Sequence, residues 1–147
     1  MYKRILVATD GSSLSKRAVN SAIALAHAFD AELLALRVVP RSVVAMWDGA
    51  AWISTSDVEK IEAQWVREAQ ATVDAVKKAA DVEGVKARAL VVKSNLTAES
   101  ILATAKKHKA DLIVMASHGR TGIKRLVLGS ETNNVLTHSP LPVLVLR

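Results

Sequence analysis

Small and hydroxyl-bearing residues gather between an apolar run at residues 112–115 and a helical pattern that starts at Ser130. The stretch reads Ala116-Ser117-His118-Gly119, then nine residues, then Gly129-Ser130. Glycine permits tight turns and lets a ligand come close to the backbone, and Ser130 can cap a helix whose free N–H groups attract an anion. The chemistry that these residues favour is the binding of a phosphate group.

Familiar phosphate loops are absent from the sequence. No G-x-x-x-x-G-K-[ST] occurs, and no G-x-G-x-x-G follows an apolar run, which argues against a P-loop enzyme and a dinucleotide dehydrogenase. The lack of cysteine excludes a thiolate metal site and a cysteine nucleophile. Because no Ser or Asp pairs with His118 in a nucleophilic constellation, we predict no catalytic residue.

Five runs rich in Val, Ile and Leu must position this stretch, and they cover residues 5–8, 33–39, 85–92, 112–115 and 143–146. Helical patterns separate them, which predicts an α/β fold with an open, mostly parallel sheet and helices on both faces. The third run alternates between apolar and polar residues, and Pro142 precedes the fifth, so we place both at sheet edges. An exposed apolar edge invites pairing with a second copy.

Apolar residues at spacings of three and four predict four helices, at residues 13–29, 56–80, from Thr97 onward, and 130–138. Ser12 or Ser13 is expected to cap the first helix. Ser56 with Glu59 is expected to form a capping box on the second.

The composition limits the class of protein. A chain of 147 residues, half of them apolar, predicts one domain over residues 1–147. The sequence has neither a signal-peptide core nor a run long enough to span a bilayer, so we expect a soluble cytoplasmic protein. The net charge of +6 comes from scattered basic residues with few aromatics, and we therefore expect no nucleic-acid partner.

One apolar segment, from Pro40 to Thr55, has no clear helical or strand period. It can be a loop that packs its own aromatic residues on the body of the protein, or a lid or protomer contact.

Ligands of open parallel sheets bind at the carboxyl ends of the strands, where the strand order reverses. That rule brings together the end of the first run, Ala8-Thr9-Asp10-Gly11-Ser12, the end of the second at Val38, and the glycine stretch. We expect the three to converge on one crevice.

These features, in this order, resemble the nucleotide-binding branch of the universal stress protein family, whose hallmark is G-x-x-G, nine residues, then G-[ST]. The resemblance also includes Ile5 to Ser12 and the closing Ser139-Pro140-Leu141-Pro142-Val143-Leu144-Val145, and covers essentially the whole chain. It implies a five-stranded, Rossmann-like sheet in the order 3-2-1-4-5, similar to the adenine nucleotide alpha hydrolases. It also implies a homodimer, formed here through the last strand, Val143-Leu146.

The resemblance further implies ATP, or ADP or AMP, in the crevice, with Mg²⁺ or Mn²⁺ carried by the phosphates and no metal site of the protein's own. Asp10 with Ala8 and Thr9 would line the adenosine side, and the backbone of Val38 would face the adenine. The remaining residues would surround the ribose and phosphates: Met115, Ala116, Ser117, His118, Gly119, Arg120, Gly129, Ser130, Glu131 and Thr132.

Ala116 stands where the hallmark has its first glycine. We expect this position to require a small residue rather than a positive φ, so that alanine is tolerated. Asp10 has a second interpretation as a helix cap or a brace of its turn. Arg120, Lys124 and Arg125 can neutralise a polyphosphate or form a solvated surface.

The leading hypothesis is an ATP-binding protein of stress adaptation in which the nucleotide is a regulatory or structural ligand, with slow hydrolysis at most. A first alternative is a dimeric interaction module from the branch of the family that does not bind nucleotide. A second is an ATP-hydrolysing or adenylating enzyme on a related fold, although the turn Asp10-Gly11-Ser12-Ser13 lacks the S-G-G-x-D-S loop of such enzymes.

Overall fold

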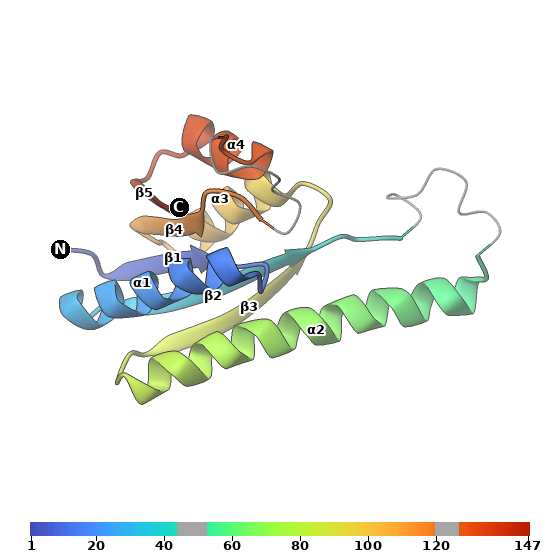
Figure 1. The fold of residues 1–147 in the computed structure, drawn as a ribbon, viewed down its shortest axis with the longest axis horizontal. Coiled ribbons are helices and arrows are strands. Elements are labelled where there is room, and N and C mark those ends of the chain that lie inside the picture. The colour runs from blue at the N-terminus through green and yellow to red at the C-terminus, as the bar shows by residue number, and fades with distance from the viewer. Residues whose placement is uncertain (44–52, 120–126) are drawn as a thin grey trace.

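A computed structural model describes residues 1–43, 53–119 and 127–147. Strands and helices alternate along the chain (Figure 1): β1 (Arg4–Ala8), α1 (Ser13–Phe29), β2 (Glu32–Val39), α2 (Thr55–Val82), β3 (Ala87–Lys93), α3 (Thr97–Lys107), β4 (Leu112–Ala116), α4 (Ser130–His138) and β5 (Val143–Leu146). Residues 44–52 of the segment from Pro40 to Thr55 lie outside the described residues, as do Arg120, Lys124 and Arg125.

The five strands form one parallel sheet in the order β3-β2-β1-β4-β5. This confirms the predicted α/β class, the strand order and the edge positions of the third and fifth strands. From β1 the sheet grows toward β2 and β3, and the chain then crosses back to place β4 on the other side of β1. The strand order therefore reverses between β1 and β4.

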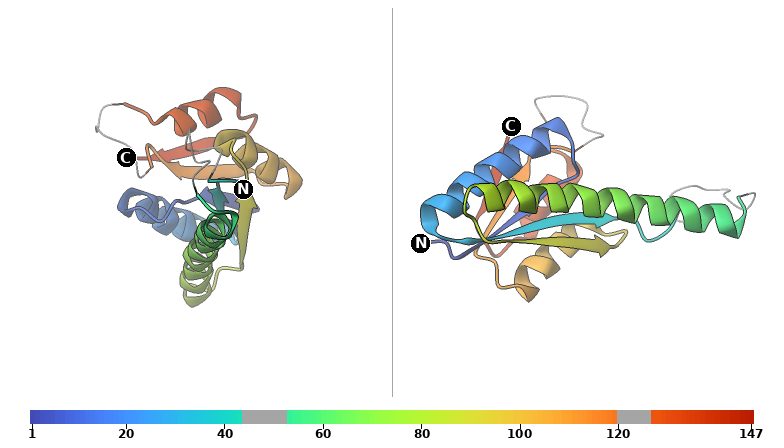
Figure 2. Two further views of the ribbon diagram at one scale, coloured as in Figure 1. Left: turned by 90° about the vertical axis from the view of Figure 1, so that its right-hand side faces the viewer. Right: turned by 90° about the horizontal axis from the view of Figure 1, so that it is seen from below.

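Helices cover both faces of the sheet (Figure 2). Helices α1 and α2 pack on one face against Ile5, Val7 and their neighbours, and α3 and α4 pack on the other against Leu6 and its neighbours. Each residue of β4 is buried, as expected for a strand between two helical layers. No helix in the described part of the chain is long and apolar enough to cross a membrane.

The helix caps differ in part from the predictions. Ser12 caps α1 through a bond from Ser15 N to its Oγ, which selects Ser12 over Ser13. The predicted capping box on α2 is wrong, because Ser54 is the cap: its Oγ accepts from Asp57 N and donates to the Asp57 carboxylate. Ser130 is likewise not a cap. Gly129 holds that position on α4 without a side-chain bond, and Ser130 is the first helical residue.

Candidate functional site

A crevice of about 590 Å³ opens at the carboxyl edge of the sheet, at the point where the strand order reverses. Its walls come from the ends of β1, β2 and β4 and from the first residues of α3 and α4. The lining residues are Ala8, Thr9, Asp10, Ser15, Leu36, Val38, Pro40, Thr97, Ile101, Met115, Ala116, His118, Gly119, Gly129, Ser130, Glu131 and Thr132. This is the location that the switch-point rule predicts.

All but two of the predicted site residues line this crevice. Ser117 is buried behind it, and Arg120 lies outside the described residues. The sequence analysis missed five lining residues: Ser15, Leu36, Pro40, Thr97 and Ile101. Thr97 could have been found, because the first residue of a helix that follows a parallel strand lies at the same edge as the strand's carboxyl end.

The turn after β1 is held by its own side chains. Asp10 Oδ1 accepts from Ser12 N at 2.9 Å, and Thr9 Oγ1 accepts from Gly11 N and lies 3.0 Å from Ser15 Oγ. Gly11 has a φ of 80°, where a side chain would be strained. Asp10 therefore braces the turn while it also lines the crevice, so its two predicted roles are compatible.

Gly119 and Gly129 are close to other parts of the site. A Cβ on Gly119 would lie 2.7 Å from Asp10 Oδ2, and one on Gly129 would lie 3.2 Å from His118 Cα. Neither residue is among the described glycines with positive φ, which are Gly11 and Gly84. The two glycines are thus required by close approach of neighbouring groups and not by an unusual backbone conformation.

Ser117 joins the glycine stretch to the sheet. Its N–H donates to Leu146 O and its carbonyl accepts from Gly129 N, both at 2.7 Å. Its hydroxyl lies 3.1 Å from His118 Nδ1. Ser117 therefore holds the start of the loop and α4 in place from behind the crevice.

Ala116 ends β4 with a strand backbone, since the only described residues other than glycine with positive φ are Asp30 and Lys109. This confirms that alanine carries no conformational strain at the position. Thr132 Oγ1 donates to Ala116 O at 2.9 Å in a buried contact. The proton of the Thr132 hydroxyl is therefore bound to the end of β4.

Glu131 bonds away from the phosphate position. Its Oε2 accepts from Ala98 N at 2.9 Å, at the start of α3. Helix α3 has Leu96 at its cap position and no side-chain cap bond from it. The carboxylate from α4 thus caps α3, while Glu131 also lines the crevice.

Val38 directs its backbone toward the crevice. Thr9 N donates to Leu36 O, toward β1, whereas Ser94 N donates to Val39 O, toward β3. Because alternate residues of a strand face the same neighbour, the N–H and C=O of Val38 face the side of β1, whose pairing with β2 ends at Leu36. A donor and an acceptor therefore lie side by side above an apolar floor that includes Leu36, Ile101 and Met115.

The charges at the site are unusual for an anion site. Among the described lining residues Asp10 and Glu131 carry carboxylates, and none is lysine or arginine. The N–H groups of Ser117 and Gly129 already bond within the protein, so the donors left for an anion are the other backbone N–H groups of the glycine stretch, the amino end of α4 and the Ser130 hydroxyl. The site can hold a phosphate through main-chain groups, with a cation to balance a longer phosphate chain.

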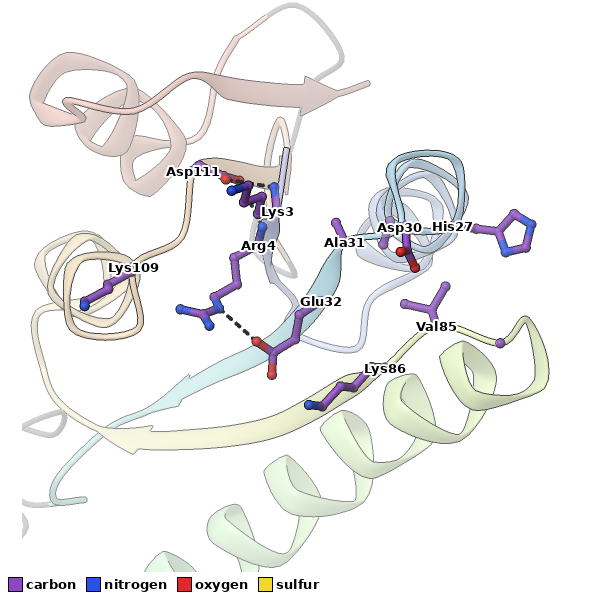
Figure 3. A pocket seen from close by; sticks show the side chains of 12 residues that line it. Lys3, Arg4, His27, Asp30, Ala31, Glu32, Val85, Lys86, Lys109 and Asp111 are labelled. Atoms are coloured by element: carbon purple, nitrogen blue, oxygen red, sulfur yellow. Dashed lines mark hydrogen bonds and ion pairs between the residues drawn. The ribbon is translucent and has the colours of Figure 1, made fainter. Parts of the chain in front are cut away.

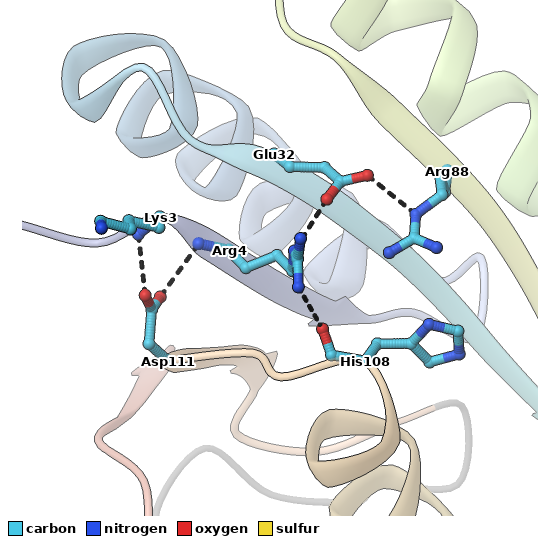
Figure 4. Close-up of polar contacts among 6 residues, drawn as sticks. All are labelled: Lys3, Arg4, Glu32, Arg88, His108 and Asp111. Carbon is cyan, nitrogen blue, oxygen red and sulfur yellow. Dashed lines mark hydrogen bonds and ion pairs between the residues drawn. The ribbon is translucent and has the colours of Figure 1, made fainter.

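A second cavity, of about 640 Å³, lies at the opposite, amino edge of the sheet (Figure 3). Two of its carboxylates, those of Asp111 and Glu32, are bound within the protein. Asp111 accepts from the backbone N–H groups of Lys3 and Arg4. Glu32 lies 2.8 Å from Nε of both Arg4 and Arg88, although the Arg88 contact is an ion pair without hydrogen-bond alignment (Figure 4).

Arg4 of this group also binds the C-terminal end of α3. Arg4 Nη1 donates to His108 O at the end of that helix, where cations are favourable. Partial burial, and then the nearby charges of Arg88, Lys107 and Arg4, lower the pKa of His108. These contacts join strand starts and a helix end, so they stabilise the amino edge of the sheet.

Comparison with known proteins gives matches along the whole chain. A family model described as the universal stress protein family matches residues 1–147. Universal stress protein MJ0531 of Methanocaldococcus jannaschii is 38% identical over 148 residues, which cover 100% of this chain and 83% of that protein.

Solved structures are also similar. The structure of MJ0577, from the same archaeon, has a TM-score of 0.83 and 29% identity, covering 99% of this chain and 96% of that one. A universal stress protein in complex with cAMP has a TM-score of 0.68 and 25% identity, covering 99% and 97% of the two chains. The matched length in each case includes every strand that borders the crevice.

Proposed function

The chain belongs to the universal stress protein family, and we propose that its carboxyl-edge crevice binds an adenine nucleotide, with ATP as the leading candidate. The nucleotide acts as a regulatory or structural ligand. The observation that carries the proposal is the meeting, in one crevice, of an exposed pair of backbone groups on Val38 and a glycine-lined helix start at Gly129 and Ser130.

Val38 suits the Watson–Crick edge of adenine. Its N–H can donate to N1 and its C=O can accept from the N6 amino group. Guanine carries an oxygen at position 6 and a hydrogen on N1, so it would set acceptor against acceptor and donor against donor. Because each unsatisfied polar group costs about 1–3 kcal/mol, we expect ATP to bind at least about tenfold more tightly than GTP.

The phosphates would lie against the glycine stretch. Gly119 and Ser130 line the crevice beside the first turn of α4, and the amino end of that helix carries partial positive charge. A bound Mg²⁺ or Mn²⁺ would be carried by the phosphate chain and would neutralise its charge.

The relatives support an adenine ligand. The family member solved in complex with cAMP is 25% identical over nearly the whole chain and shares the fold that forms this crevice. Adenosine is common to cAMP, AMP, ADP and ATP, so the contacts at Val38 suit all four.

We also propose that two chains pair through β5. This strand is at the sheet edge, and its Leu144 is 37% exposed. An apolar edge of this kind is completed by a second copy of the same strand. Sedimentation should therefore give a dimer, and Leu144→Lys should shift it toward the monomer.

The direct test is to identify the ligand released from freshly purified protein by mass spectrometry, and then to titrate ligand-free protein with ATP and GTP by calorimetry. We expect adenine nucleotide in the released fraction and the stated preference for ATP. A protein purified empty that also fails to bind added ATP, ADP, AMP and cAMP would refute the proposal.

A further inference from the structure

We propose that Glu131 is a positioning residue of the crevice, which sets the spacing of its two walls by capping α3 from α4. The inference rests on the proposed function. It gives Glu131 a role through another element, in place of direct contact with the nucleotide.

In the described part of the chain, apolar packing and the bond to Glu131 hold these two walls together. Helices α3 and α4 pack side by side on the same face of the sheet (Figures 1 and 2). Within the described residues, one side-chain hydrogen bond joins them, from Ala98 N to Glu131 Oε2 at 2.9 Å. It lies at the mouth of the crevice, since Glu131 and Thr97 both line it.

Helix α3 needs this cap. Its first N–H groups lack a partner within the helix, and Leu96 at its cap position offers no side-chain acceptor. Without Glu131 the first turn would fray, and that turn carries Thr97 and leads to Ile101, both of which line the crevice. Loss of the cap should therefore loosen the wall against which the adenosine packs.

The carboxylate also brings charge, and the two effects must be separated. A negative group beside the phosphates weakens ATP binding, whereas the cap strengthens it. Glu131→Gln removes the charge but keeps a carbonyl oxygen that can accept from Ala98 N. Glu131→Ala removes both. The comparison of Ala with Gln therefore isolates the cap.

The experiment measures ATP affinity by calorimetry for the wild type, Glu131→Gln, Glu131→Ala and the control Glu99→Ala. Glu99 is exposed in the first turn of α3 and makes no bond to α4 in the described structure, so its removal changes local charge without changing the cap. We expect Glu131→Ala to bind ATP about threefold to tenfold more weakly than Glu131→Gln, a fraction of the usual effect of losing a helix cap. We expect Glu99→Ala to stay within about twofold of the wild type.

Amide exchange of the nucleotide-free proteins gives a readout that does not need nucleotide. The Ala98 and Glu99 amides should exchange faster in Glu131→Ala and at the wild-type rate in Glu131→Gln. Faster exchange with equal ATP affinities of the Ala and Gln variants would reduce Glu131 to a purely structural cap and overturn the proposal. Unchanged exchange would overturn it too. If the wild type binds no nucleotide, the proposed function fails while the exchange result still reports on the cap.

Discussion

Replacement of Gly119 by alanine tests the packing of the crevice most directly. The new Cβ would lie 2.7 Å from Asp10 Oδ2, closer than side chains tolerate, and ordinary contact begins near 3.4 Å. The carboxylate would have to retreat by about 0.7 Å. A shift of that size along the bond to Ser12 N would stretch it from 2.9 Å to about 3.6 Å, beyond hydrogen-bond distance.

The cost follows from the bond that is lost. A hydrogen bond to a charged group contributes about 1.5–3 kcal/mol, so we expect Gly119→Ala to lower the free energy of unfolding by about 1–3 kcal/mol, the lower values applying if the loop also moves. The displaced carboxylate would also enter the crevice. We therefore expect ATP to bind at least about tenfold more weakly, which corresponds to about 1.4 kcal/mol.

A double-mutant cycle with Asp10→Ala separates this mechanism from a general effect on the loop. Urea unfolding is measured for the wild type, both single variants and the double variant. With the carboxylate gone, Gly119→Ala should cost less than about 0.5 kcal/mol, which gives a coupling energy of about 1 kcal/mol or more. Equal costs in the two backgrounds, or no cost in the wild type, would refute the reasoning.

Three further predictions concern the rest of the chain. Glu32→Gln leaves Arg4 and Arg88 without their shared counter-charge and should lower the free energy of urea unfolding by about 1–2 kcal/mol. The control Asp81→Asn breaks an exposed pair with Lys77 and should cost less than about 0.5 kcal/mol. The pKa of His108 is lowered in the folded protein, so the unfolded chain binds its proton more readily, and the free energy of unfolding should fall as the pH drops below 6.5. His108→Asn should make that fall shallower. An unchanged dependence of unfolding free energy on pH in this variant would contradict the role given to His108. Ala116→Gly should change ATP affinity by no more than a few-fold, because alanine is unstrained there, and a hundredfold gain in calorimetry would show that the natural residue impairs the site.

The sequence was sufficient for the fold because its signals are local or periodic. Runs covered on both faces, such as Leu112 to Ala116, are uniformly apolar, and the alternation in β3 marks an edge. The site could be located for a related reason. In a parallel sheet the strand ends at Ala8, Val38 and Ala116 must reach the same edge, whatever the details of packing.

Side-chain partners could not be predicted in the same way. Glu131 and Ala98 are 33 residues apart, and nothing near either residue in the sequence indicates their bond. Thr132 was expected to lie around the ribose and phosphates, and the sequence does not indicate that its hydroxyl donates to Ala116 O at the end of β4. At the start of α2, Ser54 and Ser56 each have an acidic residue three positions later, so the sequence pattern does not choose between them, and in the structure Ser54 is the cap.

The positions of the glycines show which requirements the hallmark spacing encodes. Gly119 faces the Asp10 carboxylate and Gly129 faces the backbone of Ser117 and His118, and at neither position does the described backbone take a positive φ. Ala116 lies at the end of a buried strand, where its carbonyl binds Thr132 and a methyl group fits. A small side chain is therefore sufficient at 116, while 119 and 129 have no room for one without displacing a neighbour. We therefore expect alanine to be accepted at position 116, to destabilise the protein at 129 and to destabilise it most at 119. Urea unfolding of Ala116→Gly, Gly129→Ala and Gly119→Ala, measured together, would establish or overturn that order.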